Sequence, residues 1–122
     1  MATPLSNKNH FLKAMHGDDY GTVYNLAEIV QKNDRLLVSL GREKANDIIL
    51  YSPYASRMHC TIESDDTYEH WKIRDGQWNS ILKRWISSSN GTYVNSRQIT
   101  QDGFWLESGD IITIGDDTYR YE

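Results

Sequence analysis

Cysteine, proline and long apolar runs are all scarce in this chain of 122 residues. Cys60 is the only cysteine, which excludes an internal disulfide and a cysteine-rich zinc site. No stretch approaches the roughly 18 apolar residues of a membrane-spanning helix, and residues 1–15 lack the apolar run of a signal peptide. With 2 prolines and 8 glycines, the composition is that of a folded chain. We therefore expect one globular domain, located in the cytoplasm, whose core holds without covalent cross-links.

An excess of basic charge is also absent. The chain has 13 Lys and Arg against 17 Asp and Glu, for a net charge of −4. A protein with this balance gains little from releasing counterions, so neither nucleic acid nor an anionic membrane is an expected partner. Any anion-binding site must be local.

Short runs of β-branched and aromatic residues, separated by turn residues, predict an all-β fold, either a sandwich or a barrel. The expected strands cover residues 10–15, 22–26, 35–40, 47–50, 58–64, 69–74, 92–95, 111–114 and 119–121. Residues 1–9 are polar and contain Pro4, which predicts a flexible tail before a domain at 10–122. Residues 79–86 fit either a short helix or a hairpin.

Alternation along one expected strand places Met58, Cys60 and Ile62 on its core face. His59 and Thr61 then point away from that core, so we expect an outward-facing imidazole at 59.

Three junctions between loops and strands gather groups that can bind an anion. Gly41-Arg42 follows a hydrophobic strand, and the planar guanidinium can donate two parallel hydrogen bonds to a phosphate. Ser56-Arg57-Met58-His59 offers a hydroxyl, a second guanidinium and an imidazole. Residues 87–95, Ser-Ser-Ser-Asn-Gly-Thr-Tyr-Val-Asn, form a turn rich in donors. Each junction alone is also explained by a solvated arginine, a structural histidine or a plain tight turn.

In this order and spacing, the junctions resemble the forkhead-associated (FHA) domain family. Two further segments strengthen the resemblance, Asn46-Asp47-Ile48-Ile49-Leu50 and the closing stretch Leu106-Glu107-Ser108-Gly109-Asp110 with the alternating strand after it. The resemblance covers about residues 10–122 and implies a two-sheet β-sandwich with binding loops at one end. It also implies a module that binds phosphothreonine in partner proteins and so mediates phosphorylation-dependent interactions in signalling. The implied partners are substrates of Ser/Thr kinases, no cofactor or metal is implied, and the oligomeric state stays open.

The resemblance assigns a role to each matching position. The residues matched to phosphate binding are Arg42, Ser56, Arg57 and Ser89. Those matched to the peptide main chain or to specificity are Asn90, Asn95 and Tyr54. Those matched to support of the loops are Gly41, His59, Gly91 and Thr92. The stretch 75–88 is longer than the link usual in the family, and its Trp78, Lys83, Arg84 and Trp85 either extend the peptide surface or cap the sandwich.

Two other functions compete with this one. An enzyme is disfavoured because His59 and Cys60 point to opposite faces of a strand and the chain has no Gly-x-Ser-x-Gly, Walker or His-Glu-x-x-His motif. The alternative that stays open is a phosphate-independent interaction or dimerisation module on the same fold. A large apolar patch away from the three junctions would favour it.

Overall fold

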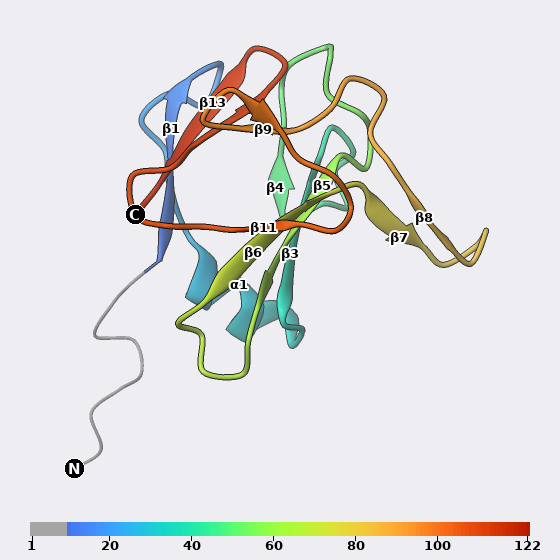
Figure 1. Ribbon diagram of the computed structural model, residues 1–122, viewed down its shortest axis with the longest axis horizontal. Coiled ribbons are helices and arrows are strands. Elements are labelled where there is room, and N and C mark those ends of the chain that lie inside the picture. The colour runs from blue at the N-terminus through green and yellow to red at the C-terminus, as the bar shows by residue number, and fades with distance from the viewer. Residues whose placement is uncertain (1–9) are drawn as a thin grey trace.

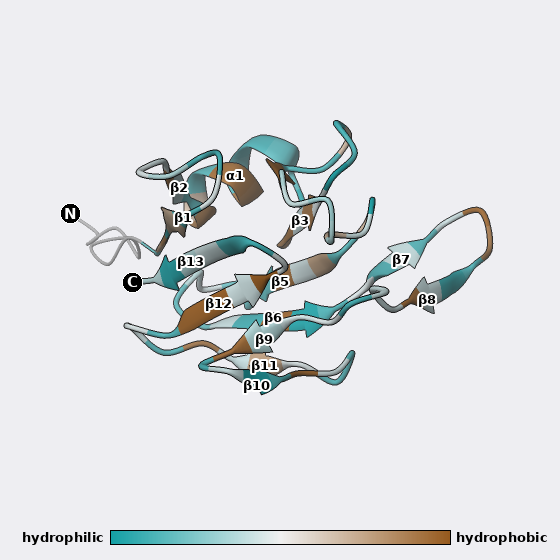
Figure 2. Cartoon of the chain, turned by 90° about the horizontal axis from the view of Figure 1, so that it is seen from above, coloured by the Kyte–Doolittle hydropathy of each residue, from teal (hydrophilic) through white to brown (hydrophobic). Residues whose placement is uncertain are grey.

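The computed structural model describes residues 10–122 and shows two β-sheets packed face to face (Figures 1 and 2). The tail expected at 1–9 lies outside the described residues. One sheet is antiparallel throughout, with the strand order β10 (Arg97–Gln98), β9 (Tyr93–Val94), β12 (Ile111–Ile114), β13 (Asp117–Tyr121), β1 (Phe11–His16) and β2 (Val23–Asn25). The other has the order β11 (Phe104–Trp105), β6 (Trp71–Asp75), β5 (Cys60–Ser64), β3 (Leu37–Gly41) and β4 (Ile48–Ile49). The predicted all-β sandwich is confirmed.

Alternating side chains from both sheets fill the space between them. In β6, Trp71 and Ile73 are buried, while Lys72 and Arg74, which alternate with them, are partly exposed. The same period of two buries Leu12 and Ala14, Val38 and Leu40, Cys60 and Ile62, and Ile112 and Ile114. Fully burying one such large apolar side chain stabilises the fold by about 1.5 to 3 kcal/mol. The core therefore fixes the strand register, and the register decides which residues begin each loop.

Three elements were absent from the sequence-based prediction: the short strands β10 and β11, and the helix α1 (Leu26–Asn33). Asn25 caps it by accepting a hydrogen bond from the backbone N–H of Glu28 at 3.2 Å, and Leu26, Ala27 and Val30 are buried beneath it. The capping pair Asn25 and Glu28 was a readable signal for this helix. The expected strand 22–26 instead ends at the cap.

The ambiguous segment 79–86 belongs to a hairpin formed by β7 (Gln77–Asn79) and β8 (Arg84–Ile86). Asn79 starts its turn, because its side-chain oxygen accepts hydrogen bonds from the backbone N–H groups of Ile81 and Leu82. Lys83 completes the turn with a φ of 55°. Figure 2 shows that this hairpin projects sideways beyond the two sheets.

The start of β5 corrects one expectation. The strand begins at Cys60, and Met58 lies before it with 37% of its surface exposed, so Met58 does not belong to the core.

No helix among residues 10–122 is both long and apolar enough to span a membrane.

Candidate functional site

Three loops meet at one end of the sandwich, where the predicted junctions lie. They are residues 42–47 after β3, residues 50–59 before β5 and residues 87–92 after β8. The backbone N–H of Arg42 donates to the Ser56 carbonyl at 3.1 Å, which joins the first loop to the second. The backbone N–H of Ser89 donates to Ser56 Oγ at 2.9 Å, which joins the third loop to the second. In Figure 1 the loop before β5 and the loop after β8 lie at the same end, far from the helix.

Gly41 lies at the end of β3, directly against the second loop. A Cβ atom at this position would lie 2.1 Å from the Arg57 carbonyl oxygen and 2.7 Å from Asn46 Nδ2. No side chain fits there. Glycine therefore allows the loops to touch, and this contact places Arg42 at the rim.

Arg42 is held in a defined direction. Its Nε donates to the Ala55 carbonyl oxygen, and its two terminal nitrogens donate to no acceptor among the described residues. Within residues 10–122, neither Arg42 nor Arg57 forms an ion pair with a carboxylate. The guanidinium of Arg42 is thus fixed by one edge while its other donors remain available to a ligand.

Ser56 lies at the centre of the three loops. Its Oγ accepts the hydrogen bond from Ser89, so the hydroxyl hydrogen is left to donate to a ligand. Its own backbone N–H donates to Nδ1 of His59 at 2.9 Å. The position of the hydroxyl therefore depends on both the third loop and His59.

His59 is fully buried, so the expectation of an outward-facing imidazole is wrong. The side chain does point away from the core stripe of β5, but the loops cover it. Nδ1 accepts from Ser56, and Nε2 lies 2.9 Å from the Gly91 carbonyl, to which it donates as N–H. Burial lowers the pKa of His59 below its usual value of 6.5, against a smaller opposing effect of the Gly91 hydrogen bond. The neutral imidazole links the second and third loops.

Asp75, at the end of β6, supports the third loop and was not singled out from the sequence. Its buried carboxylate accepts hydrogen bonds from Ser88 Oγ at 2.6 Å, from the Ser88 backbone N–H at 3.1 Å and from Thr92 Oγ1 at 2.7 Å. Ser88 Oγ in turn accepts from the Gly91 N–H. The signal was available, because Asp75 occupies the inward position that follows Trp71 and Ile73. A buried carboxylate there requires donors nearby.

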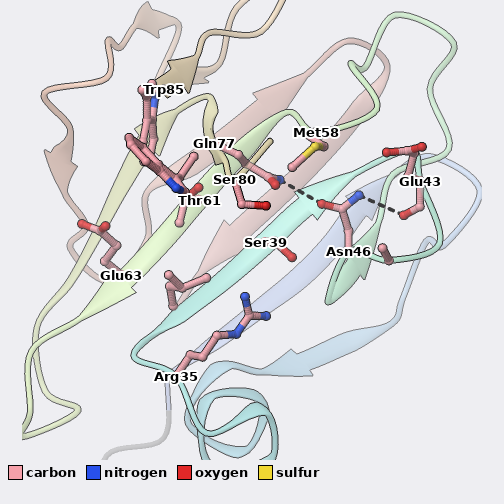
Figure 3. A pocket seen from close by; sticks show the side chains of 13 residues that line it. Arg35, Ser39, Glu43, Asn46, Met58, Thr61, Glu63, Gln77, Ser80 and Trp85 are labelled. Carbon is pink, nitrogen blue, oxygen red and sulfur yellow. Dashed lines mark hydrogen bonds between the residues drawn. The ribbon is translucent and has the colours of Figure 1, made fainter. Parts of the chain in front are cut away.

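A second buried network, also missed from the sequence, joins the first two loops to the root of the hairpin. Asn46 Nδ2 donates to the carbonyl oxygens of Glu43 at 2.9 Å and Arg57 at 2.8 Å. Gln77 Nε2 donates to Asn46 Oδ1 at 2.8 Å and to the Leu40 carbonyl at 2.9 Å. Figure 3 shows this chain from Gln77 through Asn46 to Glu43. The hairpin and the anion-binding loops therefore share one hydrogen-bonded support.

All four side chains matched to phosphate binding line one pocket of about 600 Å³. These are Arg42, Ser56, Arg57 and Ser89. Two guanidinium groups with no carboxylate partner among residues 10–122, and two hydroxyls, thus line one space in a chain whose net charge is −4. Glu43 contributes the carboxylate of this lining.

The remaining predicted site residues lie at different places. Tyr54 is exposed, and its carbonyl accepts from Asn90 Nδ2 at 2.8 Å, which keeps both residues together at the rim. Gly91 has a φ of 89°, and the neighbouring Thr92 is buried against Asp75.

Asn95 is not brought to this rim. Its amide donates to Asp110 Oδ1 at 2.8 Å and accepts from the Ile111 N–H at 2.9 Å, in a turn where its φ is 51°. Both ends of the side chain are used to join the β9–β10 turn to β12. We therefore omit Asn95 from the candidate site.

The neighbouring pair His59 and Cys60 does not form a nucleophile and its base. Cys60 is buried in the core, and burial raises the pKa of its thiol well above the usual range. Among residues 10–122, no group of three or more His, Cys, Asp or Glu side chains is placed to hold a metal ion.

The comparison with protein families agrees with this architecture. The model of the FHA domain matches residues 38–115, a segment that contains all three loops, and the chain belongs to the FHA domain family. The resemblance read from the sequence is confirmed. No curated protein matches the chain.

Solved structures of FHA domains share the fold. One, from a structural and functional analysis of phosphothreonine-dependent FHA domain interactions, is 22% identical with a TM-score of 0.69, covering 94% of this chain and 96% of the other. Mycobacterium tuberculosis EmbR, solved with a low-affinity phosphopeptide, is 27% identical with a TM-score of 0.68, covering 93% of this chain and 24% of EmbR. The FHA domain of an Arabidopsis thaliana hypothetical protein is 23% identical with a TM-score of 0.73, covering 100% of this chain and 91% of the other.

Proposed function

We propose that this FHA domain binds phosphothreonine in segments of partner proteins and acts as an interaction module, not as an enzyme. The observation that carries the proposal is the guanidinium of Arg42, fixed by the Ala55 carbonyl and facing the pocket with its terminal donors unpaired among the described residues. The FHA structure named for phosphothreonine-dependent interactions and EmbR with its phosphopeptide support the same conclusion.

The chemistry of the pocket matches a phosphate dianion. Phosphothreonine carries nearly two negative charges and three acceptor oxygens at neutral pH. Arg42 and Arg57 supply the opposing charge, and the hydroxyls of Ser56 and Ser89 supply further donors. Because the loops are already joined by hydrogen bonds, little ordering is needed when the ligand binds.

Tyr54 and Asn90 are proposed to contact the peptide beside the phosphate. Asn90 Nδ2 is held by the Tyr54 carbonyl, which leaves its Oδ1 free of any donor among the described residues. That oxygen can accept from a peptide N–H. The exposed Tyr54 ring offers an apolar surface to a neighbouring peptide side chain.

The test is titration of one phosphothreonine peptide, and of its unphosphorylated form, into wild type and Arg42→Ala. Removing one partner of a desolvated charge pair costs about 2 to 5 kcal/mol, so affinity should fall by roughly 30-fold or more. Arg97→Ala is the matched control, because Arg97 is exposed on β10 and does not line the pocket. Equal affinity for the two peptide forms would support the phosphate-independent interaction module instead.

A further inference from the structure

The tip of the β7–β8 hairpin exposes two adjacent aliphatic side chains. Ile81 is 87% exposed and Leu82 is 56% exposed, and Figure 2 shows a hydrophobic tip at the far end of the projecting hairpin. Exposed apolar groups that gather in one place commonly mark an interaction site. The hairpin falls within the stretch that is longer than the family's usual link.

The root of the hairpin is fixed to the sandwich. Trp85 Nε1 donates to the Asp75 carbonyl at 2.7 Å, and the guanidinium of Arg74 lies 3.9 Å from the centre of the Trp85 ring. A Cβ atom at Gly76 would lie 2.3 Å from the Ile86 carbonyl oxygen, so the two strands leave no space at their base. Trp85 thus caps the outer face of the sheet.

The underside of the hairpin is held as well. Figure 3 shows Trp85 and Gln77 beside Thr61, which projects from the outer face of β5. Thr61 is nevertheless buried, and its hydroxyl donates to the Gly76 carbonyl at 2.9 Å. The hairpin therefore stands at a set position relative to the loops, and its apolar tip is presented by a supported base.

The same pocket that contains the phosphate-binding candidates is also lined by the hairpin. Asn79 of β7, Ile81 of the tip and Ile86 of β8 line it from the hairpin. Arg42, Ser56 and Ser89 line it from the loops. Ile81 thus forms part of one wall of this pocket, and the opposite wall carries the arginine and serine side chains of the loops. Its neighbour Leu82 does not line this pocket.

We propose that the β7–β8 hairpin is a specificity element, which binds an aliphatic or aromatic side chain of the same partner segment that carries the phosphothreonine. The proposal rests on the proposed function. A peptide in extended conformation rises about 3.3 Å per residue, so a residue a few positions from the phosphothreonine reaches the opposite wall of the pocket. Ile81 and Ile86 then cover an apolar side chain there, while the loops hold the phosphate.

The experiment starts with a library of phosphothreonine peptides with randomised residues on both sides, selected on the immobilised wild-type protein. We expect one flanking position to be enriched in aliphatic or aromatic residues. A selected peptide, its unphosphorylated form, and a version with serine at the enriched position are then titrated into wild type, Ile81→Ser and Leu82→Ser. Because Ile81 is exposed, the substitution leaves the core unchanged, and thermal unfolding checks this.

Ile81→Ser should weaken binding of the selected peptide about tenfold, as expected for loss of a buried aliphatic contact. Binding of the serine version should change less than twofold, since the contact is already missing. Leu82→Ser should behave as wild type. The proposal is overturned if Ile81→Ser binds the selected peptide as wild type does, or if no apolar position is enriched. Those results leave phosphate-dependent binding standing, whereas the absence of any phosphate-dependent binding removes both proposals.

Discussion

Replacing Asp75 by asparagine tests whether the third loop depends on one buried carboxylate. The substitution keeps the shape of the side chain and its Oδ1, which accepts from the hydroxyls of Ser88 and Thr92. It replaces Oδ2, the acceptor for the Ser88 backbone N–H, by an NH₂ group. Two donors then face each other in a buried position. The opposite orientation of the amide would instead remove the acceptor from both hydroxyls.

The expected cost follows from the number of bonds lost. A hydrogen bond to a charged group contributes about 1.5 to 3 kcal/mol, and at least one is lost in either orientation. For 122 residues, an unfolding entropy of about 2.1 cal/mol/K per residue converts 1 kcal/mol into about 4 °C. The melting temperature should therefore fall by about 6 to 12 °C, measured by calorimetry or circular dichroism.

Asp66→Asn is the matched control for this substitution. Asp66 is exposed in the turn between β5 and β6, and its side chain has no hydrogen-bond partner among residues 10–122. The melting temperature of Asp66→Asn should stay within about 2 °C of that of wild type, as for other substitutions at exposed positions. If Asp75→Asn melts like Asp66→Asn, the carboxylate does not hold the loop, and the account of the loop's support is wrong.

Gly41→Ala should destabilise the fold by about 3 kcal/mol, because the new methyl group overlaps the Arg57 carbonyl and separates the loops. Urea unfolding measures the loss of stability, and a free energy of unfolding equal to that of wild type would contradict this prediction. Burial lowers the pKa of His59, so as the pH falls the unfolded chain takes up a proton before the folded chain does. The free energy of unfolding should therefore be constant above about pH 6.5 and decrease below it, by up to about 1.4 kcal/mol per pH unit. In His59→Gln this decrease should be less steep. Equal slopes would show that His59 is not responsible. Exchanging phosphothreonine for phosphoserine in a bound peptide should weaken binding by about 1 kcal/mol, or about fivefold, because one methyl group is lost. Isothermal titration of both peptides measures this difference, and equal affinities would contradict the prediction.

The sheets could be predicted from the sequence because a period of two is a local property. Ile111–Ile114 matched its expected bounds, and the other expected strands differ at their ends by one or two residues. The strands β10 and β11 were not predicted, because each has only 2 residues. The helix α1 was not predicted, because it has only 8 residues and its N-cap Asn25 follows residues that are typical of a strand. For the segment 79–86, local spacing favoured neither helix nor hairpin. The anchoring of Trp85 to Asp75, which stabilises the hairpin, is a tertiary contact.

The candidate site shows the same limit. Arg42 and Ser56 could be singled out because each belongs to a motif of adjacent residues. Asn46 and Gln77 could not, because they bond to each other and to Arg57 across long distances in the sequence. Asp75 was missed although its inward position in β6 was a signal, since its partners Ser88 and Thr92 are also distant. The burial of His59 was missed because alternation gives the face of a strand, and does not reveal which loops fold over that face.

The central claim is that a phosphothreonine binds where the three loops meet. The most direct measurement is titration of ¹⁵N-labelled protein with a phosphothreonine peptide, followed by the amide resonances in NMR spectra. The largest shifts should occur at Arg42, Ser56 and Ser89, and the unphosphorylated peptide should leave these resonances unchanged. Shifts confined to an outer sheet face, or identical shifts with both peptides, would contradict this claim.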